Sequence, residues 1–247
     1  MEATCQRALT LGVMSVAFTE HADFNDYVVA RNGGLRVHDY LEAIERCRSL
    51  FPGLHILSGV EIGAPHRFPR EAATLLAIGQ LDRVIGSIHQ VEENGQFVYA
   101  AESQLQGPDK ARLTMRLYLK EVLDLLQSDQ TFEVLGHLDY PKRYWPHESL
   151  GYLESEFEPE FREILAVAAA RRAVLELNTN ASTDPARKFC PGPLIIRWWY
   201  EAGGQAVSLG SDAHEPHDLT VGFELASKIL KSVGFQEPRY PTDFWRR

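Results

Sequence analysis

The sequence has few cysteines, no excess of positive charge and no long apolar run, and each absence argues against a class of protein. Its three cysteines, Cys5, Cys47 and Cys190, are widely spaced and form no CxxC pair. This argues against a disulfide framework or a cysteine zinc site, and it fits a reducing cytoplasm. Lys and Arg number 25 against 34 Asp and Glu, a formal net charge of −9, so we expect no binding to nucleic acid.

Membrane and secretion signals are also missing. The most apolar stretch, residues 164–177, is too short for a membrane span and contains Arg171 and Arg172, which predicts a protein without membrane segments. The first residues lack a basic region followed by an apolar one, so they are no secretory signal and we expect a cytoplasmic location. No GxSxG, P-loop or CxxC motif occurs, which leaves serine-hydrolase, nucleotide-driven and thiol-redox chemistry without support.

What the sequence does contain is a serial alternation of apolar strands and amphipathic helices. Strands are predicted at residues 14–18, 55–60, 84–88, 132–135, 173–177 and 206–209. Helices are predicted at residues 1–11, 37–51, 68–78, 110–126, 157–170, 194–202 and 219–233. Such units form a parallel sheet, and 247 residues without a break in composition suit one α/β domain over residues 1–247. No Gly-rich phosphate turn follows the first strand, which favours a TIM-like barrel over an open sheet.

Metal-ligand residue types follow several of these strands. A single histidine at a strand end is often a hydrogen-bonded structural residue, but several on one face of a barrel favour a shared site. Imidazoles and carboxylates that converge in this way bind zinc, iron and similar ions. The candidate metal ligands are His21, Glu61, His89, His137, Asp212 and His214.

Three further residues are candidates for binding substrate. Lys142 and Arg143 come shortly after His137, and Asn178 follows the fifth predicted strand. The two basic residues fit a clamp for phosphate oxygens, and they fit equally well as solvated charges of a loop. The sequence leaves both readings open.

The strand-end motifs, taken in order, resemble those of a known family. They are Thr19-Glu20-His21, Gly59-Val60-Glu61, Ser87-Ile88-His89, Gly136-His137-Leu138-Asp139-Tyr140, Glu176-Leu177-Asn178-Thr179 and Gly210-Ser211-Asp212-Ala213-His214. The set resembles the motifs of the PHP (polymerase and histidinol phosphatase) family. The last three motifs look most like those of its histidinol-phosphatase branch.

The resemblance implies a distorted barrel of seven strands, up to three divalent metals (zinc, iron or manganese) and hydrolysis of phosphate monoesters. Carried over to this chain, Glu61 would bridge two metals, and His89 and His137 would complete the second. Asp212 would belong to the first metal, and His21 with His214 would hold the third.

One departure from the family concerns the start of the chain. Members of the family begin with a strand that ends in a His-x-His pair, and here no strand precedes the first predicted helix. We therefore expect six strands in place of seven and fewer metals. Met1 is then either an internal methionine of a longer reading frame or the start of a shortened member. The gap in the barrel would make the chain prone to aggregation, unless a loop or a partner covers the gap.

The expected function is metal-dependent hydrolysis of a small phosphate monoester such as histidinol phosphate. His214 or His21, if free of metal, would protonate the leaving alkoxide. Two alternatives stay open at this point. One is a metal-binding protein without catalysis, and the other is a hydrolase that cleaves a different bond with the same metals.

Overall fold

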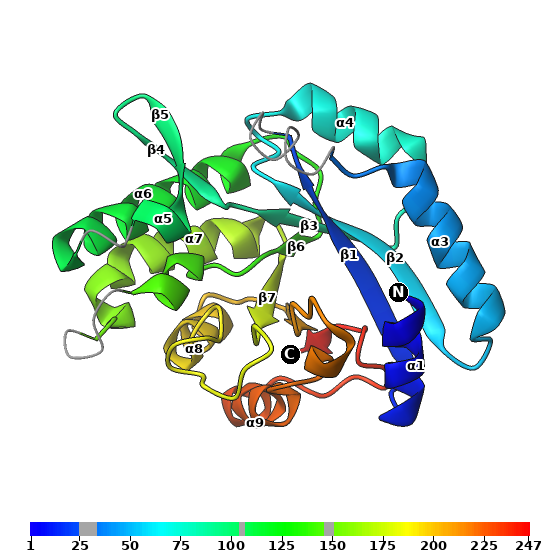
Figure 1. Ribbon diagram of the computed structural model, residues 1–247. Coiled ribbons are helices and arrows are strands. Elements are labelled where there is room, and N and C mark those ends of the chain that lie inside the picture. Colours follow the sequence, from blue (N-terminus) through cyan, green and yellow to red (C-terminus); the bar gives the residue numbers. More distant parts are fainter. Residues whose placement is uncertain (25–33, 104–106, 146–150) are drawn as a thin grey trace.

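The computed structural model describes residues 1–24, 34–103, 107–145 and 151–247. Its main sheet has seven strands in the order β1-β2-β3-β6-β7-β8-β9, and it curls into part of a barrel (Figure 1). The first six run parallel and the last runs antiparallel to β8. The bounds are β1 Ser15–Asp23, β2 His55–Gly63, β3 Arg83–Ser87, β6 Val134–Leu135, β7 Val174–Asn178, β8 Ala206–Gly210 and β9 Trp245–Arg246.

Helices cover the outer face of this sheet (Figure 1). The longer ones are α1 Glu2–Thr10, α3 Val37–Leu50, α4 Pro69–Ile78, α6 Pro108–Gln127, α7 Glu158–Ala170, α8 Pro193–Glu201 and α9 Phe223–Val233. Their apolar stripes bury side chains such as Tyr118, Phe161 and Trp199, which are fully buried in one large core. Within the described part of the chain, no helix is long and apolar enough to cross a membrane.

The parallel α/β barrel predicted from the sequence is confirmed, with all six predicted strands in place. Two features were not predicted. Strand β9 is only two residues long and pairs antiparallel with Ala206 and Val207. A hairpin, β4 Gln90–Glu93 and β5 Gln96–Tyr99, lies where neither a strand nor a helix was predicted. Its turn residues Asn94 and Gly95 both have positive φ, which is the conformation that Asn-Gly hairpin turns require.

The curled sheet does not close between β1 and β8. Among the described strands, β1 pairs only with β2, and β9 covers only the first two residues of β8. The segment before β9 closes one end of this gap: the backbone N–H and the hydroxyl of Thr242 lie 3.3 and 3.0 Å from Ser15 Oγ, and Arg83 donates to the Thr242 carbonyl at 2.9 Å. A loop therefore covers part of the gap, as the sequence led us to expect.

Candidate metal centre

Three of the predicted ligands form a buried group, which we call the inner group: Glu61, His89 and His137. Glu61 lies on β2, and each histidine lies two residues after the end of its strand, His89 after β3 and His137 after β6. Glu61 Oε1 accepts a hydrogen bond from His137 Nε2 at 2.8 Å and lies 3.2 Å from His89 Nε2. All three residues are at most 9% exposed. One carboxylate thus faces the Nε2 atoms of two imidazoles, a donor set typical of zinc and similar ions.

Charge pairing decides the protonation of this group. Burial alone would raise the pKa of Glu61, but the hydrogen bonds from His137 and His89 outweigh it and hold the pKa well below its usual value. Burial would lower the pKa of His89, but its contacts with Asp23 and Glu61 raise it well above its usual value. Burial dominates at His137, whose pKa is lowered. The group therefore presents an ionised carboxylate to any bound cation.

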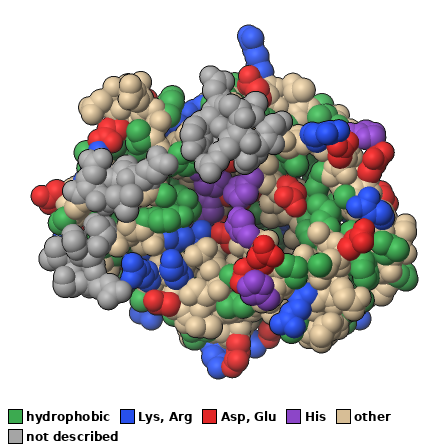
Figure 2. Space-filling view, in the orientation of Figure 1, with side chains coloured by type: hydrophobic (Ala, Val, Ile, Leu, Met, Phe, Trp, Pro, Cys, Tyr) green, Lys and Arg blue, Asp and Glu red, His purple; other side chains and the backbone are tan. Residues whose placement is uncertain are grey.

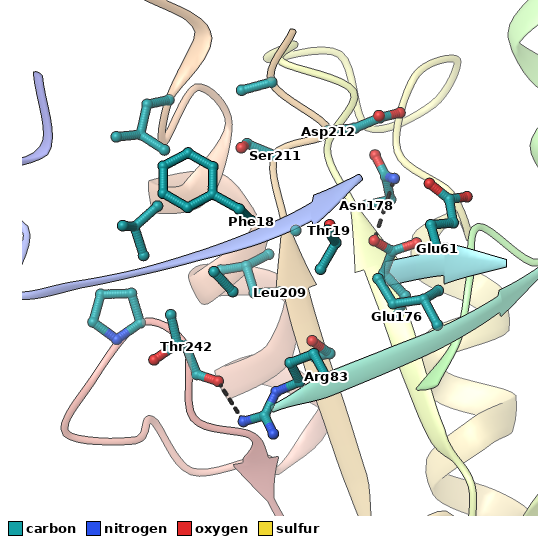
Figure 3. Close-up of a pocket in the computed structure, with 18 of the residues that line it drawn as sticks. Phe18, Thr19, Glu61, Arg83, Glu176, Asn178, Leu209, Ser211, Asp212 and Thr242 are labelled. Carbon is teal, nitrogen blue, oxygen red and sulfur yellow. Dashed lines mark hydrogen bonds between the residues drawn. The ribbon is translucent and has the colours of Figure 1, made fainter. Parts of the chain in front are cut away.

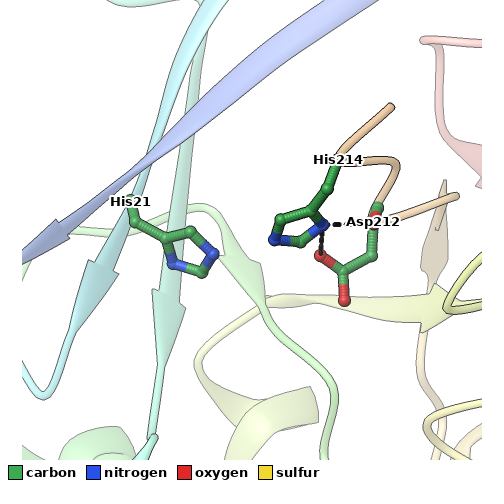
Figure 4. Close-up of side chains that lie close together, drawn as sticks. All are labelled: His21, Asp212 and His214. Atoms are coloured by element: carbon green, nitrogen blue, oxygen red, sulfur yellow. Dashed lines mark hydrogen bonds and ion pairs between the residues drawn. The ribbon is translucent and has the colours of Figure 1, made fainter. Parts of the chain in front are cut away.

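The other three predicted ligands form a more exposed group, which we call the outer group: His21, Asp212 and His214 (Figure 4). One ligand atom from each lies within 4.8 Å of those of the other two. His214 is 71% exposed and His21 is 47% exposed as side chains. His214 Nδ1 lies 2.9 Å from the carbonyl oxygen of Asp212, so the neutral ring keeps Nε2 unprotonated and available as a ligand.

Asp212 adopts a backbone conformation that L-residues rarely use. Its φ is +53°, in the left-handed region. Aspartate tolerates this region better than most residues, and such strain gathers at functional sites because the surrounding structure enforces it. Here the conformation follows β8 and turns the chain so that the carboxylate of Asp212 faces His214.

His21 connects the two groups. Its Nδ1 lies 3.5 Å from Glu61 Oε2, and its ring centroid is 5.3 Å from that of His89 and 6.0 Å from that of His214. His21 and Glu61 are also direct partners in the β1–β2 register. The structure thus brings all six predicted ligands to one end of the sheet, and in the space-filling view histidines gather in the middle of one face (Figure 2).

The three predicted substrate-binding residues have different surroundings. Arg143 donates to Asp212 Oδ2 at 2.9 Å and to Asn178 Oδ1 at 2.7 Å, so these two residues adjoin the outer group. Lys142 is fully buried, and its Nζ lies 2.9 Å from Asp139 Oδ2. The structure therefore does not bring Lys142 to the site, because its ammonium lies in an internal ion pair.

A pocket of about 350 Å³ lies in the gap between β1 and β8, next to the ligands (Figure 3). Glu61, Glu176, Asn178 and Asp212 line its polar part, near both groups. Apolar side chains, among them Phe18, Ile85, Leu209 and Phe223, line other parts of the pocket together with polar groups such as Arg83 and Thr242. The pocket combines metal ligands with apolar side chains, as small-molecule sites commonly combine polar and apolar groups.

Sequence reasoning did not select Glu176 as a site residue. Its Oε2 accepts the backbone N–H of His137 at 2.8 Å, and Oε1 accepts from Asn178 at 3.3 Å. Burial, reinforced by the charge of Glu61, raises the pKa of Glu176 to about 8. A signal was available in the sequence, since a glutamate inside the otherwise apolar run Val174–Leu177 needs a buried partner.

The amino-acid sequence is similar to those of a known protein family. The chain matches the PHP domain over residues 1–180. It is 29% identical to a histidinol-phosphatase of Lactococcus lactis over 93% of this chain and 84% of that protein. It is 27% identical to a probable histidinol-phosphatase of Clostridium acetobutylicum over 91% of this chain and 86% of that one.

Solved structures agree. The crystal structure of the Lactococcus lactis histidinol phosphate phosphatase, complexed with zinc, L-histidinol and phosphate, covers 95% of this chain and 88% of its own, with a TM-score of 0.82 and 27% identity. A putative histidinol phosphatase from Listeria monocytogenes shares the fold, with a TM-score of 0.76 and 19% identity. The family expected from the motifs is confirmed: this chain belongs to the PHP domain family.

Proposed function

We propose that this protein is a metal-dependent phosphatase of a small phosphate monoester, and that its substrate is histidinol phosphate. The observation that carries the proposal is the inner group, in which a buried, ionised Glu61 faces the Nε2 atoms of His89 and His137. The similarity to a phosphatase whose structure contains zinc, L-histidinol and phosphate supports the choice of substrate.

The six predicted ligands would form two metal sites. Glu61, His89 and His137 would hold one divalent ion, and His21, Asp212 and His214 would hold another, with zinc, iron or manganese as the candidates. When bound, such ions supply positive charge to phosphoryl oxygens and lower the pKa of a water molecule. The donor set fits this role because it combines carboxylate oxygens with imidazole nitrogens, which bind such ions once their protons are released.

The remaining groups would bind and orient the substrate. Arg143 is held by Asp212 and Asn178 beside the outer group, where its guanidinium would attract a phosphoryl group. Lys142 would act indirectly, because its ion pair with Asp139 fixes the 3₁₀ turn Tyr140–Tyr144 from which Arg143 extends. If one of the two exposed histidines, His214 or His21, is free of metal, it would donate a proton to the leaving alkoxide.

The experiment that tests the proposal is phosphate release from histidinol phosphate. Protein stripped by a chelator should be inactive and should recover activity with Zn²⁺ or Mn²⁺, whereas Glu61→Ala should recover little. A panel of other phosphate monoesters, a phosphodiester and an amide would show whether histidinol phosphate is preferred. Failure of the purified protein to bind any metal above background would contradict the proposal.

One structural feature favours a second candidate, a metal-binding protein without catalysis. The outer group borders the gap between β1 and β8, and two of its three side chains, His21 and His214, are exposed. A protein that binds zinc at the inner group and hydrolyses none of the panel would support this second function. An added N-terminal strand that greatly increased turnover would instead show that filling the gap completes an enzyme.

A further inference from the structure

Asp23 belongs to neither ligand group, yet it contacts a histidine of each. It lies two residues after His21 at the end of β1, and its side chain is 13% exposed. Its Oδ1 lies 3.0 Å from His89 Nδ1, and its Oδ2 lies 3.9 Å from His21 Nδ1. The contact with His89 is a hydrogen bond, whereas the longer one with His21 is an electrostatic contact.

The neighbouring strand has a matching notch for this carboxylate. Gly63 is the direct partner of Asp23 in the β1–β2 register. A Cβ atom at position 63 would lie only 1.8 Å from Asp23 Oδ1. A side chain there would displace the carboxylate, so the absence of one at Gly63 is what lets Asp23 reach His89.

The chemistry of the contact fixes the state of the imidazole. A carboxylate accepts hydrogen bonds and donates none when ionised, so His89 Nδ1 must carry the proton. The other ring nitrogen, Nε2, then faces Glu61 Oε1 at 3.2 Å. A histidine that donates one ring N–H to a carboxylate offers the opposite nitrogen to a metal in a fixed orientation.

We propose that Asp23 is a positioning residue, which holds the proton on His89 Nδ1 and so directs His89 Nε2 toward Glu61 and the inner metal. The inference rests on the proposed function for the metal, but the hydrogen bond itself exists without it. Asp23 acts through His89 and needs no contact with substrate.

The test uses the full chain and four variants. Asp23→Ala removes the acceptor, Asp23→Asn keeps an acceptor oxygen without the charge, and Gly63→Ala keeps the carboxylate but displaces it. Asp82→Asn is the matched control, because Asp82 is also a hydrogen-bonded carboxylate but lies before β3, at the opposite end of the sheet. Thermal melting of each variant reports any general loss of stability.

Two readouts separate positioning from general structure. In metal-free protein, ¹⁵N spectra of the histidine rings should show a protonated, slowly exchanging Nδ1 on His89 in the wild type and in Asp82→Asn, lost in Asp23→Ala and Gly63→Ala. Zn²⁺ affinity, measured by competition with a chelator, should fall by about 10- to 100-fold in Asp23→Ala and less in Asp23→Asn.

Several results would overturn the inference. One is an unchanged His89 Nδ1 proton signal in Asp23→Ala. Another is a Zn²⁺ affinity of Asp23→Ala within about twofold of the wild type, since the expected loss is at least about tenfold. A wild type that binds no Zn²⁺ would contradict the proposed function, and the spectra of the metal-free protein would then decide the role of Asp23 alone.

Discussion

The inner and outer groups contain the same kinds of side chain but differ in how the fold holds them. The inner residues lie on β2 or two residues after β3 and β6, and each of these strands has a hydrogen-bonded strand on both sides. The outer residues come from β1 and from the turn after β8, the two strands that border the gap. Every inner residue is buried, whereas His21 and His214 are exposed.

This difference suggests that position within the sheet determines how well a metal subsite is preformed. The inner side chains already hydrogen-bond one another, and Glu176 and Asp23 hold His137 and His89 from behind. Ordering them for a metal costs little further entropy. In the outer group, Asp212 pairs with Arg143 and its carbonyl contacts His214, but His21 and His214 are exposed. We therefore expect the outer group to bind metal more weakly.

The largest expected effect comes from removing the charge at the centre of the inner group. Glu61→Gln keeps the shape of the side chain but cannot neutralise a cation. Loss of a residue that only supports a ligand costs up to about a hundredfold, so loss of the ligand's charge should lower turnover by more than that. Zinc content and phosphate release measure this. Glu133→Gln, an exposed glutamate just before β6, is the control and should behave as the wild type.

The second effect concerns the buried ion pair between Lys142 and Asp139, and it is measured as a change in the free energy of unfolding. Lys142→Met leaves Asp139 buried without its ion pair, and breaking a buried pair costs about 3–5 kcal/mol. Lys120→Met removes an exposed pair with Asp124 and should cost less than about 1 kcal/mol. Urea unfolding of both variants makes the comparison. Equal losses would mean that the buried pair gives the fold no special support.

The third effect depends on pH and concerns Glu176. Because its folded pKa of about 8 lies above the usual 4.5, its contribution to stability is complete below pH 4.5 and is lost as pH rises through 8. Metal-free Glu176→Gln should therefore match the wild type near pH 4.5 and exceed it above pH 8, by about 5 kcal/mol at most. Melting curves across this pH range measure the effect. A stability difference between the two proteins that does not change with pH would contradict the prediction.

Local patterns in the sequence predicted the fold well. Apolar runs gave all six parallel strands, and polar residues at their ends gave six ligands that the structure brings together. The short strand β9 could not be predicted, since two residues carry no periodicity and their pairing with Ala206 and Val207 depends on the tertiary fold.

Contacts that form only in the folded chain limit how much of the site the sequence can predict. Lys142 follows the histidine motif as a phosphate clamp would, but its partner Asp139 is identified only by the folded turn. Asp23 and Gly63 are 40 positions apart, and their fit appears only once β1 and β2 are in register. Spacing along the chain predicts which residues reach the end of the sheet, whereas burial and register determine what each of them does there.

The contrast between the two groups is tested most directly by titrating Zn²⁺ into chelator-stripped protein by calorimetry, in the wild type, His89→Ala and His214→Ala. We expect the first equivalent to bind tightly in the wild type and in His214→Ala, and to lose most of its affinity in His89→Ala. If His214→Ala weakened the binding of the first Zn²⁺ equivalent as much as His89→Ala does, the proposed difference between the two groups would be wrong.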